Sequence, residues 1–356
     1  MTDRPTPRPS ASVPRPEAGA GAEGSRRPVD WRAAAGRPVV PGLVQVQVVN
    51  YRRADLTLEC LESIRRQTYR NFRLLVIDNA STSESRAALE RRGRDFSLVA
   101  NVDNLGWGAG HNAGFAWRGF ATDPEFFLVV NNDAVLDPDC LAELVGTLAG
   151  DPGCAIASPM IYKDSTRTRV DNVGFDLSYR WFLPLDWAYI RGDHARHARR
   201  GSRRVTWSDD TVSLMRRADI LEVGGYDPVY FMYVDETDLA YRLGKAGRSI
   251  RVNYRAAAYH GGKGSSGGEV SVFSLHCKFR NWARFHRKHF GPLHRPYAWL
   301  WLAAMFLVKS AGLLAAGRKK DLRELSRLLI TGADLPRRPT LERPRPTSPS
   351  PLRKAP

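Results

Sequence analysis

The stretch FFLVVNNDAVLD, residues 126–137, decides the fold. Residues 126–130 form a run of apolar β-formers that is long enough for a buried strand and too short for a helix. The carboxylate of Asp133 follows almost at once. In an open α/β sheet ligands bind where a central strand ends, and a carboxylate there suits a hard cation such as Mg²⁺. An Asn-Asp turn that simply closes the strand explains the same residues, and the stretch favours neither interpretation over the other.

Apolar strand-like segments alternate with amphipathic or charged helical segments on both sides of this stretch. Such alternation predicts βαβ units, and therefore an α/β fold with a mainly parallel central sheet flanked by helices. We expect strands at 43–49, 72–77, 96–100, 126–130 and 155–158, and helices at 54–67, 83–94 and 138–148.

The net charge of +17 is concentrated outside the middle of the chain. Residues 41–275 carry 29 basic and 29 acidic side chains, whereas 276–323 carry a net charge of +10 and 337–356 one of +5. A neutral body argues against a nucleic-acid groove and predicts no nucleic-acid partner. The basic C-terminal region instead predicts a surface partner at that end, such as an anionic membrane.

The termini and the cysteines indicate the cellular compartment of the protein. Residues 1–40 and 336–356 are rich in Pro and Arg without apolar periodicity, and we expect both tails to be disordered. The first residues contain no apolar signal segment, and the four cysteines are scattered without metal or redox spacing. These features predict a protein of the reducing cytoplasm.

Asp78 and a glycine-rich run are the first candidates for donor binding. Asp78 ends a predicted strand, where a carboxylate can accept hydrogen bonds from a base or a ribose, or can cap the helix that follows. Gly106, Gly108 and Gly110 precede another helix, and they let the backbone approach a ligand close to a helix N-terminus that favours phosphate. The run matches neither dinucleotide nor Walker fingerprints.

The segment FMYVDETDLAYRL, residues 231–243, places three acids at the start of a predicted helix. Asp235 and Asp238 share one helix face, and acids in a first turn are favourable for the helix dipole in any case. The apolar and aromatic residues before them put the acids at the edge of a core, where a carboxylate can act as a general base. His260, which follows a strand-like segment, is either a further metal ligand or a structural loop histidine.

These segments together resemble glycosyltransferase family 2, and more narrowly its rhamnosyltransferase-like branch. The resemblance covers about residues 43–290 and rests on six motifs in family order. The motifs are VVNYRRADLTLECLESIRRQTY, VIDNAST, NLGWGAGHNAGF, VVNNDAVL, GGYDPVYFMYVDETDLAYRLGKAG and YHGGKGSS.

The resemblance implies a GT-A fold, a dTDP- or UDP-linked sugar donor, a divalent cation (Mg²⁺ or Mn²⁺) and transfer with inversion. It implies that Asp133 binds the metal, that His260 contacts the metal or the diphosphate, and that Glu236, or Asp235 in its place, deprotonates the acceptor hydroxyl. Two positions depart from the family pattern, because Asn131 replaces the first acid of the D-x-D motif and the usual Glu-Asp pair is reversed. The donor-binding residues that it implies are Asn50, Asp78, Asn104, Gly106, Gly110, Asn112 and Asn132. Asp238, Tyr233 and Trp107 would support the acceptor.

The C-terminal region contains an apolar stretch at 297–317, interrupted by Lys309. A central Lys costs about 2.5–3.5 kcal/mol on insertion scales, and the stretch barely reaches spanning length. Trp299 and Trp301 with flanking basic residues favour a helix in the membrane interface, against a spanning helix or a buried core helix. The acceptor is then a lipid-linked or cell-wall glycan at the inner face of the plasma membrane.

The sequence therefore predicts four parts: a tail at 1–40, a GT-A domain at 41–290, a membrane-associated helical segment at 291–335 and a tail at 336–356. It predicts a peripheral membrane enzyme that moves a sugar such as rhamnose, and it specifies no oligomeric state. The alternative from another class is a non-catalytic nucleotide-sugar or glycan-binding module on the same fold.

Overall fold

The computed structural model describes residues 37–93, 95–167, 169–178, 183–184, 201–261 and 271–331. Val39 and Val40 belong to the first strand, so the N-terminal tail predicted at 1–40 is too long by at least these two residues. Residues 1–36 and the predicted tail at 336–356 lie outside the described residues.

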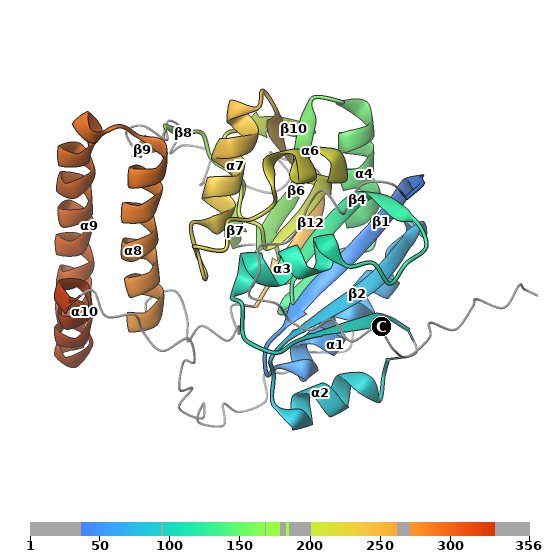
Figure 1. Ribbon diagram of the computed structural model, residues 1–356, viewed down its shortest axis with the longest axis horizontal. Coiled ribbons are helices and arrows are strands. Elements are labelled where there is room, and N and C mark those ends of the chain that lie inside the picture. The colour runs from blue at the N-terminus through green and yellow to red at the C-terminus, as the bar shows by residue number, and fades with distance from the viewer. Residues whose placement is uncertain are drawn as a thin grey trace, which may run out of the picture.

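The described residues form a ten-stranded sheet whose main path runs β10-β12-β6-β11-β4-β1-β2-β3, with β5 and β7 paired to it at the side (Figure 1). β8 (Leu177–Ser178) and β9 (Leu183–Pro184) make a separate two-stranded ribbon. The strands of the large sheet are β1 (Val39–Asn50), β2 (Phe72–Asn79), β3 (Ser97–Asn101), β4 (Asp123–Asn131), β5 (Ala134–Leu136), β6 (Cys154–Tyr162), β7 (Val170–Asn172), β10 (Ser202–Val205), β11 (Val212–Arg216) and β12 (Ser249–His260).

The sheet is mixed, although its first half is parallel as predicted. β3, β2, β1 and β4 run in parallel. β11 then enters antiparallel between β4 and β6, and β10, β5 and β7 also pair antiparallel. The predicted α/β class with a helix-flanked central sheet is confirmed. β6 and β12 also pair in parallel, so six of the ten strands run in the same direction and the predicted mainly parallel sheet is confirmed.

Helices cover both faces of the sheet (Figure 1). α1 and α4 pack on one face in a cluster that includes Leu61 and Leu144, and α3, α6 and α7 pack on the other with Phe115 and Leu239. The helices on the sheet are α1 (Ala54–Arg65), α2 (Ser83–Glu90), α3 (Trp107–Ala116), α4 (Cys140–Gly150), α6 (Arg217–Val223) and α7 (Asp235–Lys245).

The alternation LVQVQVV in β1 explains how α3 is held against the sheet. Successive side chains of a strand point to opposite faces, so Val44, Val46 and Val48 enter the core with α1, and the glutamines face α3. Gln45 donates from Nε2 to the Gly114 carbonyl at 2.9 Å, and Gln47 donates to the His111 carbonyl at 3.3 Å. Both amides are buried, and they orient α3 across the sheet.

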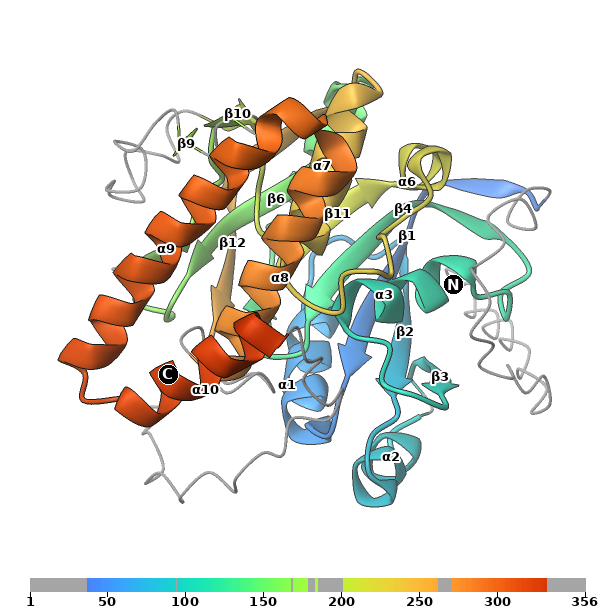
Figure 2. The ribbon, with the colours of Figure 1, turned by 60° about the vertical axis from the view of Figure 1, so that its left-hand side comes forward.

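Three C-terminal helices form a group beside the sheet: α8 (Val272–His289), α9 (Arg295–Ala315) and α10 (Lys319–Thr331), with a short 3₁₀ turn η3 (Pro292–His294) before α9 (Figure 2). They share an apolar cluster that includes Phe279, Leu302 and Leu325. α8 lies inside the predicted 41–290 domain, yet it packs with α9 and α10. Apart from the end of the N-terminal tail, the domain boundaries stay predictions.

Asp238 connects this helical group to the body. Its side chain is fully buried on α7 and accepts hydrogen bonds from Arg242, Lys288 and His289, each at 2.7 Å. Tyr230 adds a longer bond at 3.4 Å. These hydrogen bonds outweigh burial, which acts in the opposite direction, and they hold the pKa of Asp238 well below its ordinary value. Asp238 therefore has a structural role, in place of the acceptor support that we predicted.

We predict that Asp238→Asn lowers the free energy of unfolding by about 3–5 kcal/mol, since it removes the buried charge that Arg242, Lys288 and His289 share. Because the folded pKa is depressed, this contribution is present above the unfolded pKa of about 3.9 and is lost as the pH falls through the folded value. Denaturant unfolding measures both effects. Asp321→Asn breaks a half-exposed pair with Arg318 and should cost at most about 1 kcal/mol. Equal losses for the two variants would contradict the prediction.

Candidate active site

The candidate site lies where parallel strands β1, β2 and β4 end together. The register pairs Asn50 with Asp78 and Val49 with Asn131, so the last residues of the three strands lie side by side. Ligands bind at this carboxyl edge in open α/β sheets. The strand ends therefore bring together residues that lie far apart in the chain.

Asp78 is fully buried and is held by two side chains. Asn50 donates to its Oδ1 at 2.9 Å, and Arg86 donates to its Oδ2 at 3.0 Å. Helix α2 is capped by Thr82, whose side chain accepts from the Ser85 amide, so the alternative that Asp78 caps this helix is wrong. A surface pocket of about 590 Å³ opens beside the network and is lined by Ser81, Arg86 and Asn101 among others.

Asn79 is a buried residue that the sequence reasoning missed. Its Nδ2 donates to Asn104 Oδ1 at 2.8 Å and to the Gly106 carbonyl at 2.9 Å. Its Oδ1 accepts from Asn101 Nδ2 and the Leu105 amide, both at 3.1 Å. Asn79 thus shapes the loop before α3. An Asn directly after the Asp that ends a strand was the available signal.

The N-terminus of α3 points at protein groups. The Trp107 amide donates to the Phe231 carbonyl at 2.9 Å, and the Gly108 amide donates to Asp235 Oδ2 at 3.1 Å. The Trp107 indole donates to Asn131 Oδ1 at 2.7 Å. We predicted that this helix start favours a phosphate, but a carboxylate already takes that place. Asn131, at the first position of the D-x-D motif, orients Trp107.

The glycines and Asn112 of this motif serve close packing. Gly106 has φ +86°, and a Cβ there would lie 1.9 Å from the Phe231 carbonyl oxygen, so only glycine fits. A Cβ at Gly110 would press on Val49 at 3.2 Å. Asn112 is buried, and both of its amide atoms bond to the backbone of Tyr226, at 2.7 and 3.0 Å. Gly110 and Asn112 therefore support the wall of the site, whereas donor contacts were predicted for them.

Asp133 follows β4, and its side chain is 5% exposed. Its Oδ1 lies 3.3 Å from His260 Nε2, while its buried Oδ2 has no hydrogen-bond partner among the described residues. The antiparallel pairing of β5 with β12 sets His260 opposite Ala134, which brings the histidine to Asp133. On its other side His260 Nδ1 lies 3.3 Å from Asp171 Oδ2. Asn132 donates to Thr57 Oγ1 at 3.3 Å.

His260 carries a proton in this arrangement. Burial lowers its pKa, but the hydrogen bonds to Asp133 and Asp171 outweigh burial and raise the pKa to about 10. The imidazolium thus balances two carboxylates. A histidine that binds a metal must be neutral, so a bound cation would take over the charge that this proton now supplies.

The residues around Asp133 fit a cation that is shared with a substrate. In the described residues no group of three or more His, Cys, Asp or Glu side chains could hold a metal. Mg²⁺ and its relatives commonly use one or two carboxylates together with substrate phosphates and water. The buried, unpartnered Oδ2 of Asp133 is an oxygen of this kind, and it costs free energy unless something pairs with it.

Asp235 and Glu236 begin α7 and form a second acidic group. Asp235 is 1% exposed, and Glu236 is half-buried. Burial raises the pKa of Asp235 to about 6. Burial, and then the neighbouring Asp235, raise the pKa of Glu236 well above its ordinary value. A hydrogen bond links the two side chains, so the pair shares its protons and titrates as a unit.

Asp209 and Asp210 are two further acids that the sequence reasoning did not single out. The Thr211 carbonyl accepts from the Asn131 amide at 2.9 Å, so the segment before β11 lies beside the end of β4. The Tyr226 hydroxyl donates to Asp210 at 2.7 Å, and burial raises the pKa of Asp210 to about 7. The charge of Asp209 acts on both His260 and Glu236. The pair Asp-Asp before an apolar strand was the signal.

Tyr233 lies one residue before the cap of α7, with Lys278 above its ring at 4.8 Å.

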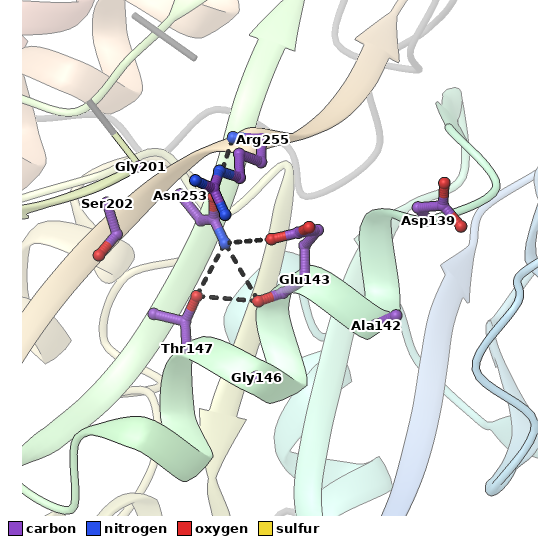
Figure 3. Close-up of a pocket in the computed structure, with 9 residues that line it drawn as sticks. All are labelled: Asp139, Ala142, Glu143, Gly146, Thr147, Gly201, Ser202, Asn253 and Arg255. Atoms are coloured by element: carbon purple, nitrogen blue, oxygen red, sulfur yellow. Dashed lines mark hydrogen bonds between the residues drawn. The ribbon is translucent and has the colours of Figure 1, made fainter. Parts of the chain in front are cut away.

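Another pocket, of about 600 Å³, lies between α4 and β12 (Figure 3). Asn253 donates there to Glu143 and Thr147 (Figure 3). None of the predicted site residues lines this second pocket.

A sheet edge that gathers Asp78, Asp133 and an acidic helix start agrees with a GT-A-type glycosyltransferase. Residues 46–223, half of the chain, match the family described as Glycosyl transferase family 2. The chain belongs to glycosyltransferase family 2 and is an enzyme of that class.

Two curated relatives are rhamnosyltransferases. The chain is 25% identical over 302 residues to N-acetylglucosaminyl-diphospho-decaprenol L-rhamnosyltransferase of Mycobacterium tuberculosis, covering 79% of this chain and 97% of the relative. It is 22% identical over 232 residues to the rhamnosyltransferase WbbL of Escherichia coli, covering 61% and 82%. The predicted rhamnosyltransferase-like resemblance is confirmed.

Two solved structures share the fold. The mannosyltransferase PcManGT from Pyrobaculum calidifontis, with GDP-Man and Mn²⁺, superposes with a TM-score of 0.51 at 19% identity over 85% of each chain. GalNAc-T7 with UDP, GalNAc and Mn²⁺ superposes with a TM-score of 0.52 at 14% identity, over 69% of this chain and 47% of that one. The predicted GT-A fold is confirmed.

We predict that Glu236→Gln raises the melting temperature at pH 7.5 by a few degrees. The native state binds more protons than the unfolded state between the ordinary and the raised pKa of the pair, so wild-type stability falls as the pH rises through that window. Glutamine cannot ionise, and its amide can still donate to Asp235. Thermal unfolding of both proteins between pH 5 and 8 measures the effect, and parallel curves would contradict it.

Proposed function

We propose that this enzyme transfers a sugar, with rhamnose as the first candidate, from a dTDP- or UDP-linked donor to a hydroxyl of a lipid-linked or cell-wall glycan. The observation that carries the proposal is the sheet edge at which Asp133 with His260 and Asp235 with Glu236 border one site. The names of the two rhamnosyltransferase relatives support the sugar, and the Mycobacterium name supports a lipid-diphosphate acceptor.

The donor would lie along the edge from β2 to β4. Asp78, fixed by Asn50 and Arg86, would accept a hydrogen bond from the N–H of a uracil or thymine base. Asn104, Gly106 and Asn132 would line the sugar and diphosphate. Asp133 and His260 would hold Mg²⁺ or Mn²⁺, which offsets negative charge on the departing diphosphate.

The acceptor would be activated by the pair at the start of α7. Glu236 is the more exposed member, while Asp235 is buried and bonded to the Gly108 amide. We therefore assign Glu236 as the base and Asp235 as the group that orients it. Ionised Glu236 takes the proton of the acceptor hydroxyl, the hydroxyl oxygen bonds to the anomeric carbon, and the carbon–oxygen bond to the diphosphate breaks. One in-line displacement inverts the anomeric centre.

The C-terminal helices would hold the enzyme on an anionic membrane at its cytoplasmic face. The segment Pro292–Ala315 is long and apolar enough to cross a membrane. One face of α9 packs on α8 and α10, and the other exposes Trp299, Leu300, Leu307 and Val308, each about two-thirds exposed. A helix with one face on protein and one apolar face outward suits a position in the interface, with basic residues on anionic headgroups.

We predict that variants of the metal site and of the base have different effects on donor binding and on transfer. Asp133→Ala should lose the part of nucleoside-diphosphate affinity that depends on Mn²⁺ while keeping the metal-free part. Glu236→Gln should keep both parts and lose transfer by roughly 100-fold or more. Calorimetry with and without Mn²⁺ and a transfer assay measure these quantities. Unchanged transfer in both variants would refute the roles, and binding without transfer to any acceptor would support the binding-module alternative.

We predict that the protein binds vesicles containing anionic lipid and that Leu300→Glu with Leu307→Glu abolishes the binding, since both charges enter the exposed face of α9. Val102→Glu is the matched control, because Val102 is 71% exposed on the body of the enzyme. Vesicle flotation at low and high salt measures binding. A wild type that ignores vesicles, or a double variant that still floats, would contradict membrane docking.

A further inference from the structure

The turn that leads into α7 has an unfavourable backbone. Tyr233 has φ +67° and Val234 has φ +69°, so two consecutive residues with side chains adopt the left-handed conformation. This conformation is uncommon for bulky residues and a clear outlier for β-branched ones such as Val. Strained residues of this kind persist only where surrounding contacts hold them, and they gather at functional sites.

Asn281 of α8 supplies such a contact. Its side chain is fully buried, and its Nδ2 donates to the Met232 carbonyl at 2.8 Å and to the Tyr233 carbonyl at 2.9 Å. Both partners are carbonyl oxygens, which only accept, so the amide NH₂ must face them. The Asn281 Oδ1 atom is buried without a hydrogen-bond partner in the described part of the chain. The side chain is therefore oriented by the two bonds that it donates to the turn.

The turn fixes where Asp235 and Glu236 point. They are the first two residues of α7, and the residue that caps the helix is Val234 itself. On the near side of the turn the Phe231 carbonyl is held by the Trp107 amide. On the far side the Asp238 amide donates to the Val234 carbonyl at 2.9 Å. Asn281 holds the two carbonyls between these anchors.

We propose that Asn281 is a positioning residue for the Asp235–Glu236 pair, because it holds the left-handed turn that directs both carboxylates into the site. The proposal rests on the proposed function, in which this pair activates the acceptor. Asn281 acts through the turn and is not itself a catalytic residue.

The test uses Asn281→Leu in the full-length protein, since leucine keeps the branching of asparagine at Cγ and removes both donated bonds. A misplaced catalytic group lowers turnover strongly, and we expect kcat to fall by roughly 10- to 100-fold with the KM for the donor within about threefold. Arg284→Ala is the matched control. Arg284 also lies on α8 and donates to a carbonyl of the same loop, that of Val229 at 3.0 Å, outside the strained turn. Its kcat should stay within about threefold of wild type.

A double-mutant cycle separates the turn from general packing. Glycine adopts positive φ without penalty, so the turn in a Val234→Gly background needs less support. The fold loss in kcat caused by Asn281→Leu should therefore be several times smaller in that background than in the wild type. The packing lost with Val234 is the same with and without Asn281→Leu, so it does not affect the ratio of the two kcat values in the Val234→Gly background. An equal loss in both backgrounds would overturn the proposal.

Hydrogen exchange of the Asp238 amide gives a readout that does not depend on catalysis. Asn281→Leu should speed this exchange, and Arg284→Ala should not. An unchanged exchange rate of the Asp238 amide would show that Asn281 does not hold the turn. Faster exchange with unchanged kcat would show that the turn does not affect the reaction. If Glu236→Gln and Asp235→Asn both keep full transfer, the proposed function has failed, and the exchange result still decides whether Asn281 holds the turn.

Discussion

The buried contact between Asp133 and His260 is the constraint on which the site depends. It exists because β4 ends at Asn131 and β5 then pairs antiparallel with β12, which sets Ala134 opposite His260. A carboxylate buried at a sheet edge is unstable without a positive charge nearby, and the His260 proton supplies that charge. Among the residues that the structure describes, the same pairing leaves one oxygen of Asp133 without a hydrogen-bond partner. Folding therefore assembles a site that a cation and a diphosphate would complete.

Much of this arrangement follows from local sequence patterns. Residues 126–130 read correctly as a buried strand, and the alternation of strands and helices gave the α/β class. Asp78 and Asp133 were each placed at the end of a strand from sequence, and the ends of parallel strands share one edge. The family resemblance supplied the GT-A fold and the enzyme class, and the comparisons confirm both.

The unpredicted features depend on contacts between distant segments. The antiparallel entry of β11 brings Asp209 and Asp210 to the site, and no periodicity within residues 206–211 reveals it. The Gly-rich run looked like a phosphate loop, yet its helix start receives Asp235, which is 127 residues away from Gly108. Asp238 and Asn112 have partners on other helices and turns, Lys288 of α8 and the Tyr226 backbone among them, so sequence reasoning assigned both residues to ligands. Asn281 belongs to the same group.

The central claim is that the end of β4 forms a metal-dependent donor site beside the acids of α7. The most direct measurement is anomalous diffraction from crystals of the protein grown with Mn²⁺ and a nucleoside diphosphate. The account predicts a manganese peak at coordination distance from Asp133 Oδ2, with the diphosphate on the ion and the base beside Asp78. A nucleotide bound elsewhere, with Asp133 still paired to His260 and no ion beside it, would contradict the account.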